Sequence, residues 1–318
     1  MGTVFGHFLS VKIAKVFHSS PIPLRIYEFG AGSGKLCVQV LSELNRLGCD
    51  IDDYVIFEIS PRLKQIQQQL VAKQSPEVST KVHWSDFPTD KGMQGVVIAN
   101  EVIDAMPVEL IRFVEGRVHQ GYVTELGDTF QLEFRTILKE EFEQTCSQIN
   151  WPKFEGIYTS EIHCRAEAWL EKVGENFEVG SMLISDYGFP QHEYYHPDRN
   201  QGTLMCHRRH HSLHNPLEYI GCQDITAHVN FSSLARVAES VGLEVNGFTT
   251  LAGFIVDTGL ESLDLTSLQV SEQMSVTQQL NTLTSPSEMG ELFKVMELSK
   301  NIEPDRLGFE TFNHMHRL

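Results

Sequence analysis

Three glycines alternate with other residues directly after a short apolar segment near the N-terminus, in the stretch Glu28-Phe29-Gly30-Ala31-Gly32-Ser33-Gly34. Glycine tolerates positive φ and lets a ligand approach the backbone closely, so such a loop can hold a nucleotide. The dinucleotide fingerprint GxGxxG needs a third glycine where Lys35 stands, and the P-loop pattern GxxxxGK[ST] needs serine or threonine where Leu36 stands. The spacing therefore argues against both a dinucleotide loop and a P-loop.

The remaining pattern, Glu-x-Gly-x-Gly-x-Gly, resembles the first motif of Rossmann-like methyltransferases. The resemblance implies that Glu28 lies near the methionine part of S-adenosylmethionine. It also implies that Gly30, Gly32 and Gly34 leave room for the nucleoside. The cofactor expected from this loop is therefore S-adenosylmethionine.

Two acids and an aromatic residue follow the next predicted strands. Glu58 ends the second strand, where a carboxylate can accept hydrogen bonds from both ribose hydroxyls. A nicotinamide enzyme uses an acid in the same way, so Glu58 alone does not discriminate between the two cofactors. Asp86 and Phe87 follow the third strand, where methyltransferases of this superfamily commonly contact adenine.

Hydrophobic periodicity assigns the segments around these residues to alternating strands and helices. Leu36, Val40 and Leu44 recur at helical spacing, and Ser60 with Pro61 is typical of a helix start. This order predicts an α/β fold with a mostly parallel, doubly wound, Rossmann-like sheet. The predicted strands are 24–29, 54–59, 82–84, 95–99, 181–187, 243–249 and 291–298, and the main predicted helices are 35–47, 161–173 and 231–241.

The middle of the chain does not continue this alternation of strands and helices. Residues 111–135 indicate β-hairpins, because apolar runs are separated by turn sequences that contain glycine. Residues 189–224 are polar, and a loop of that length in a compact domain is usually functional or a lid. We therefore divide the chain into a cofactor-binding half (1–110), an inserted hairpin region (111–160) and the rest of the domain (161–318), with a polar insertion at about 189–224.

The first residues contain apolar side chains at helical spacing, including Phe5, Phe8 and Ile13, with Lys12 and Lys15 off that stripe. A core-facing helix is the simpler interpretation. A basic, amphipathic start that lacks acids is also compatible with an organelle presequence.

Several motifs beyond the loop resemble the MidA family, whose relatives include the mitochondrial complex I assembly methyltransferase. Residues 99–107 (ANEVIDAMP) are similar to its NE-x-x-DA-x-P motif, and 185–189 (SDYGF) to its DYG motif. Residues 201–204, 223–229 and 287–294 match further family segments in the same order. The resemblance covers essentially the whole chain, although the family usually carries a segment before the helix at which this sequence starts.

The resemblance implies a class I methyltransferase that modifies a protein, because the mitochondrial member is regarded as a protein arginine methyltransferase acting on a complex I subunit. The expected partner is thus a protein substrate such as a respiratory-complex subunit, and the inserted hairpins could support a homodimer. The expected location is the cytoplasm in a bacterium and the mitochondrial matrix in a eukaryote. A non-catalytic assembly factor that keeps the methyltransferase fold is the alternative function, and a nicotinamide oxidoreductase is a third.

Methyl transfer to a guanidinium requires carboxylates that orient the acceptor and disperse its charge. Glu101 and Asp104 follow the fourth strand at the edge where ligands bind, so we predict them as catalytic residues. Asn100 is expected to contact the amino-acid part of the cofactor. Alternatively, Asp104 caps a turn and Glu101 is a solvated acid.

Three more residues are predicted to contact the acceptor. Asp186 and Tyr187 end a later strand at the same edge, and His228 is a candidate proton acceptor. A core aromatic role for Tyr187 and a structural role for His228 are the competing interpretations.

The composition excludes several classes of function. A net charge of −17 argues against nucleic-acid binding, and the absence of a long apolar run argues against a membrane span. Six cysteines without a CxxC pair indicate reduced thiols. His207, His210, His211 and His214 have helical spacing, but no convincing ligand set surrounds them, so we predict no metal site.

Overall fold

The computed structural model describes residues 2–74, 76–87, 92–137, 140–147, 149–154, 156–208, 211–213, 215–266 and 268–318. The chain forms two compact units. The first contains residues 1–102, 170–187 and 235–318, and the second contains residues 103–169 and 188–234. The predicted hairpin region and the polar insertion both fall in the second unit.

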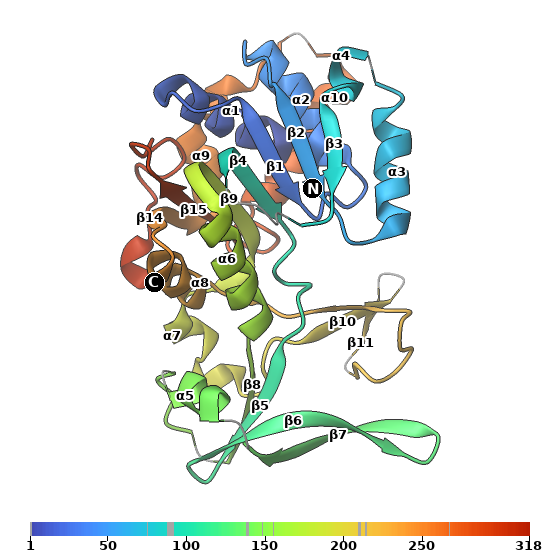
Figure 1. The fold of residues 1–318 in the computed structure, drawn as a ribbon, viewed down its shortest axis with the longest axis vertical. Coiled ribbons are helices and arrows are strands. Elements are labelled where there is room, and N and C mark those ends of the chain that lie inside the picture. The colour runs from blue at the N-terminus through green and yellow to red at the C-terminus, as the bar shows by residue number, and fades with distance from the viewer. Residues whose placement is uncertain are drawn as a thin grey trace. The chain divides into compact units, whose positions relative to one another are not determined.

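The first unit is built on one sheet, whose strands lie side by side across the upper part of Figure 1. Five neighbouring strands are parallel, and β15 and β14 add an antiparallel edge. The sheet confirms the predicted α/β fold. Its strand order is β14 (Glu244–Thr250), β15 (Phe293–Lys300), β9 (Phe177–Phe189), β4 (Met93–Asn100), β1 (Arg25–Phe29), β2 (Asp53–Phe57) and β3 (Val82–Ser85).

Helices cover this sheet and supply most of the core. The first helix, α1, packs on α2, α9 and α10, and its Phe5, Phe8 and Ile13 are fully buried. The core-facing interpretation of the N-terminal segment is therefore confirmed. The helices that contribute to this unit are α1 (Thr3–Ser19), α2 (Lys35–Arg46), α3 (Pro61–Val71), α4 (Pro76–Ser79), α6 (Cys164–Asn176), α8 (Phe231–Ser240), α9 (Leu251–Thr258) and α10 (Val270–Thr284), with short 3₁₀ turns at Leu260–Ser262 and Met315–Arg317.

The second unit contains two small sheets. One has the order β7 (Thr129–Thr136), β6 (Arg117–Leu126), β5 (Glu109–Val114) and β8 (Ile157–Ile162), all antiparallel, which confirms the predicted hairpins. The other has the order β11 (His211–Leu213), β10 (Met205–Arg208) and β12 (Asp224–Thr226). The remaining elements are α5 (Glu140–Ser147), α7 (Gln191–Tyr194), a 3₁₀ turn at Pro197–Arg199 and β13 (Val229–Asn230), which pairs with the end of β9.

Two secondary-structure predictions were wrong in this unit. The helix predicted from residue 161 begins at Cys164, because residues 157–162 form β8 and pair with β5. The segment 189–224 is not one long loop, since its strands β10 to β12 form a sheet. These strands are only three or four residues long and carry mostly polar side chains, so periodicity does not reveal them.

A buried carboxylate organises the interior of the second unit. Glu161 accepts hydrogen bonds from the Thr203 and Leu204 N–H groups and from the Tyr194 hydroxyl, at 2.9–3.1 Å. Burial raises the pKa of Glu161, and these donors oppose the increase. Gly202 lies directly against the carboxylate, where a Cβ atom would come within 2.2 Å of Oε1.

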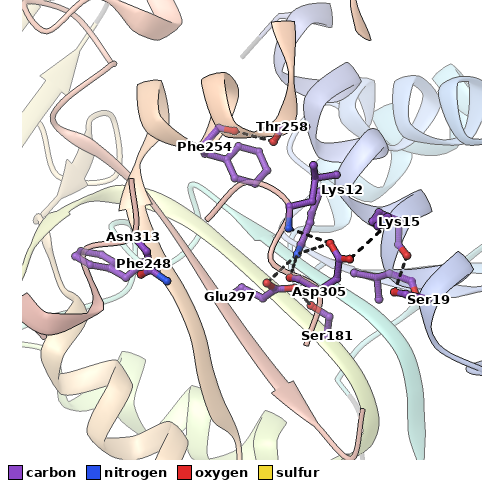
Figure 2. Close-up of polar contacts among 12 residues, drawn as sticks. Lys12, Lys15, Ser19, Ser181, Phe248, Phe254, Thr258, Glu297, Asp305 and Asn313 are labelled. Atoms are coloured by element: carbon purple, nitrogen blue, oxygen red, sulfur yellow. Dashed lines mark hydrogen bonds and ion pairs between the residues drawn. The ribbon is translucent and has the colours of Figure 1, made fainter. Parts of the chain in front are cut away.

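A buried ion pair anchors α1 in the first unit (Figure 2). The Lys12 ammonium lies 2.9 Å from Glu297 Oε2 and donates to the Asp305 carbonyl oxygen at 2.6 Å. Ser181 donates to the other Glu297 oxygen at 2.8 Å. Removing one member of such a pair leaves an uncompensated buried charge, whereas removing both avoids that cost.

We therefore expect Lys12→Met to lower the free energy of unfolding by about 3–5 kcal/mol, because Glu297 stays buried and loses its counterion. The double variant Lys12→Met/Glu297→Leu should recover much of that loss. Lys15→Met is the matched control, since Lys15 is on the same helix and half exposed. Urea unfolding followed by circular dichroism measures all three, and equal losses in the single and double variants would contradict the assignment.

Candidate cofactor site

The carboxyl ends of the five parallel strands meet at one edge of the first unit's sheet. Most of the predicted site residues lie at or just beyond these ends. They are Glu28 within the last two residues of β1, Gly30 to Gly34 after it, Glu58 after β2, Asp86 and Phe87 after β3, Asn100 and Glu101 at the end of β4, and Asp186 and Tyr187 near the end of β9.

The loop after β1 has the backbone conformation that its glycines allow. Gly30, Gly32 and Gly34 have φ angles of 62°, 53° and 80°, a region that favours glycine. Among the described residues other than Gly32 and its two chain neighbours, no heavy atom lies within 4 Å of the position that a Cβ atom of Gly32 would occupy. The loop therefore leaves open space beside Gly32, and Gly34 forms the N-cap of α2.

Glu58 presents a carboxylate that is already held at both oxygens. Its Oε1 accepts from the Ser60 N–H at 2.8 Å, and its Oε2 accepts from the Gln67 amide at 2.9 Å. A carboxylate oxygen has a second lone-pair direction, so each oxygen can accept one further hydroxyl. The next residue, Ile59, is 93% exposed. An oriented carboxylate beside an exposed apolar side chain fits a ribose with an attached base.

Gln67 is a site residue that the sequence did not reveal. Its side chain is fully buried, and the same amide nitrogen that donates to Glu58 also donates to the Gly32 carbonyl oxygen at 3.0 Å. Its carbonyl oxygen accepts from Trp84 Nε1 at 2.9 Å. Gln67 thus connects the glycine loop, the acid after β2 and strand β3. It stands among other glutamines on α3, so no sequence signal distinguishes it.

The two residues after β3 differ in their surroundings. The Asp86 carboxylate is exposed and lies 4.0 Å from Lys64 Nζ. Phe87 is half-buried and packs near Phe29 and Phe57, with ring centroids 6.1 and 6.5 Å away. The aromatic group can therefore form an apolar wall at this end of the sheet, while Asp86 remains a predicted adenine contact.

Glu28 lies deeper than the sequence alone suggests. Its carboxylate is buried and accepts a hydrogen bond from the Tyr54 hydroxyl at 2.8 Å. Burial raises the pKa of Glu28 to about 7; the Tyr54 hydrogen bond lowers it, and the nearby Glu58 carboxylate raises it further. Glu28 thus links β1 to β2 through Tyr54, and its contact with the methionine part of the cofactor stays a prediction.

Asn100 and Glu101 form a constrained pair at the end of β4. Ser185 donates to Asn100 Oδ1 at 2.8 Å, and the Glu101 N–H donates to the Ser185 carbonyl oxygen at 3.0 Å. Glu101 is exposed and has φ 52°, which is unusual for a residue with a side chain. Strained backbone that is held by neighbouring hydrogen bonds concentrates at functional sites. Glu101 is therefore the strongest catalytic candidate.

The remaining predicted residues are less accessible or belong to the second unit. Asp186 is fully buried and accepts from the Tyr187 N–H at 2.9 Å, and the Tyr187 ring packs edge-on against Phe293. In the second unit, the Asp104 carbonyl oxygen accepts from the Ala227 N–H at 2.9 Å. The N–H of the adjacent His228 donates to Thr203 Oγ1 at 3.0 Å. These arrangements suit structural roles, and acceptor binding by Asp104, Asp186, Tyr187 and His228 stays a prediction.

The histidine-rich segment shows no metal site in the part of the chain that the structure describes. His210 and His214 lie outside the described residues, and His207 and His211 are on the neighbouring strands β10 and β11. Among the described residues, no group of three or more His, Cys, Asp or Glu side chains could hold a metal ion.

Residues 8–249 match the family described as "Putative S-adenosyl-L-methionine-dependent methyltransferase". The chain belongs to this family. Its cofactor is S-adenosylmethionine, and the open glycine loop, the held Glu58 carboxylate and the exposed Ile59 fit that molecule. The family assignment also confirms the predicted resemblance to MidA-type methyltransferases.

Solved structures and curated proteins agree with the family assignment. A superfamily member from Burkholderia thailandensis, crystallised with S-adenosyl-homocysteine, is 33% identical; its TM-score is 0.92, and the match covers 100% of this chain and 81% of that one. The mitochondrial protein arginine methyltransferase NDUFAF7 homolog of Drosophila melanogaster is 24% identical over 93% of this chain and 72% of the fly protein. The NDUFAF7 protein of Xenopus laevis is 26% identical over 92% and 71%.

We expect Gln67→Leu to weaken binding of S-adenosyl-homocysteine by about tenfold or more, because the methyltransferase then loses the donor that orients Glu58 and Gly32. Gln67→Glu keeps the shape but puts a carboxylate beside Glu58, so its defect should be larger at pH 8 than at pH 6. Gln68→Leu is the control, because Gln68 is exposed on the same helix. Isothermal titration measures the Kd, and unchanged binding by both Gln67 variants would refute this role.

A second prediction concerns the pH dependence of stability. Because the folded pKa of Glu28, about 7, exceeds the ordinary value of 4.5, the unfolded chain releases this proton first. The stability that Glu28 contributes is complete below about pH 4.5 and is lost as the pH rises towards 7, by about 3 kcal/mol. Relative to the wild type, Glu28→Gln should therefore gain stability between pH 5 and pH 8. Urea unfolding at a series of pH values measures the two free energies of unfolding, and a constant difference between them from pH 5 to pH 8 would contradict this prediction.

Proposed function

We propose that this S-adenosylmethionine-dependent methyltransferase transfers the methyl group to a protein side chain, with arginine as the favoured acceptor. The observation that carries the proposal is the exposed Glu101 carboxylate, held in a strained conformation at the cofactor edge of the sheet. The names of the fly and frog relatives, which are protein arginine methyltransferases, support the choice of arginine.

The chemistry assigns a definite task to Glu101. S-adenosylmethionine supplies an electrophilic methyl group, and the protein positions the acceptor in line with it. A carboxylate accepts hydrogen bonds from a guanidinium and holds the positive charge on the nitrogens that face it. The nitrogen that attacks can thereby keep more of its lone pair. Asn100, bonded to Ser185, fixes the end of β4 on which Glu101 stands.

The proposal extends to the acceptor protein and the cellular location, which we infer from the names of the relatives. Both named relatives are mitochondrial proteins, so a respiratory-complex subunit is a reasonable acceptor to test first. In a eukaryote the enzyme would act in the matrix, and in a bacterium it would act in the cytoplasm. None of the helices among the described residues is long and apolar enough to cross a bilayer.

The test of activity uses the full chain with S-adenosylmethionine labelled on the methyl group, a cell lysate and arginine-containing peptides. We expect labelled protein that yields methylarginine after acid hydrolysis. Glu101→Gln should lower the rate by about 100-fold or more while the Kd for S-adenosyl-homocysteine changes little, because the carboxylate acts on the acceptor. Label on another residue type would reject arginine, and cofactor binding without any transfer would favour a non-catalytic assembly factor.

Stability gives an independent measure of the same residue. Glycine adopts φ 52° without the steric cost that a Cβ atom brings. The free energy of unfolding of Glu101→Gly should therefore equal that of the wild type or exceed it by about 1 kcal/mol. The same variant should transfer no methyl group. A clear loss of stability in Glu101→Gly would show that the side chain serves the fold instead of the reaction.

A further inference from the structure

The β6–β7 hairpin of the second unit has one apolar face that is open to solvent. Val123 lies opposite Leu132, and Glu125 lies opposite Phe130, so the four side chains share a face. Val123 is 59% exposed, Phe130 52% and Leu132 38%. Contiguous exposed apolar side chains of this kind mark interaction surfaces.

Two opposite charges lie at the two ends of this apolar face. At the base of the hairpin, the Arg112 guanidinium stacks 3.7 Å from the centroid of the Phe134 ring. It can extend there because Phe134 pairs with Gly121, which has no side chain. Glu125 lies at the other end, beside Phe130. Within the part of the chain that the structure describes, neither Arg112 nor Glu125 has an ion-pair partner.

The opposite face of the hairpin is different. Arg135 pairs with Glu133 at 2.7 Å, and the Tyr122 hydroxyl donates to Gln120 at 2.8 Å. The charged groups of that face therefore pair with each other. On the apolar face, Arg112 donates a hydrogen bond to Thr159 Oγ1 at 3.4 Å, but neither it nor Glu125 is neutralised by an ion pair among the described residues.

Strand β7 is an edge strand of its sheet and contains neither a proline nor a bulge. Among the described residues it pairs only with β6, and its register is continuous over eight residue pairs. Residues 129–136 contain neither proline nor lysine, the residues that commonly block edge-to-edge association. An exposed hairpin of this kind is typical of a surface that is covered in the assembled protein.

We propose that the apolar face of the hairpin is a self-association surface, and that its occupant is the same face of a second copy of this chain. The arrangement of residues along the face is self-complementary. Arg112 and Phe134 lie on one side of the Val123–Leu132 pair, and Glu125 with Phe130 lies on the other. We consider a two-fold axis that lies between the two faces, runs across the strands and passes over that pair. It places Arg112 of each copy over Glu125 of the other, and Phe134 over Phe130.

This pattern explains why a second copy is the favoured occupant. An isologous contact needs each charge to meet its opposite on an identical surface, which requires one acid and one base at equal distances from the axis. A nucleic acid or an anionic membrane would instead favour several bases on one face. Around the Val123–Leu132 pair the surface instead joins one arginine to one acid, because Arg117 and His119, which share this side of β6, lie farther from the pair, and Glu125 would repel an anion.

The first test measures mass in solution by sedimentation velocity and multi-angle light scattering of the full chain. We expect a dimer whose fraction rises with concentration. Leu132→Lys should convert it to a monomer, because the charge lies at the centre of the contact. Gln131→Lys is the matched control, since its side chain lies on the opposite face, and it should remain dimeric. A monomeric wild type at about 100 µM would overturn the proposal.

The second test uses charge exchange between copies. Arg112→Glu and Glu125→Arg should each raise the dissociation constant of the dimer at least about tenfold, because each creates like charges across the axis. An equimolar mixture of the two variants should associate again, since both contacts then pair opposite charges. Circular dichroism checks that Arg112→Glu is folded. Failure of two folded variants to associate in the mixture would overturn the proposed register, and undiminished association of either variant alone would do so as well.

Discussion

The buried amide of Gln67 is the interaction on which the cofactor edge depends. A loop of alternating glycines has almost no side chains with which to pack, so its position must be fixed through its backbone. Gln67 does this by donating to the Gly32 carbonyl oxygen, and the same nitrogen holds the Glu58 carboxylate. The parallel strands bring the loop and the acid to one edge, but the amide fixes them relative to each other. Trp84 in turn fixes the amide through its oxygen.

Each unit encloses a buried charge and stabilises it in a different way. In the first unit Glu297 is neutralised by an ammonium group, whereas in the second Glu161 is surrounded by neutral donors from Thr203, Leu204 and Tyr194. Both arrangements join segments that are distant in sequence. An ion pair depends on two side chains, but the Glu161 arrangement also depends on the backbone of residues 203 and 204. The second unit is therefore specified largely by loop geometry.

The sequence predicts the first unit better than the second for physical reasons. Strands buried on both faces and helices with apolar stripes produce strong periodic signals, and the glycine loop has a motif that follows from its function. The acids at strand ends, Glu58 and Glu101, are predictable because parallel strands end at one edge. Gln67 is not predictable, since its importance comes from contacts across the fold. The short strands β10 to β12 and the burial of Asp186 are likewise decided by tertiary packing, and neither has a local sequence signal.

Ile59 follows Glu58 at the bend after β2, and almost all of its side chain is in contact with water. Any ligand that covers it must release ordered water from an apolar surface, and this release gives a negative change in heat capacity. The enthalpy of binding at this edge will consequently depend on temperature even if the affinity varies little. An organism that lives in the cold and one that lives in the heat would obtain similar occupancy from different thermodynamic sources.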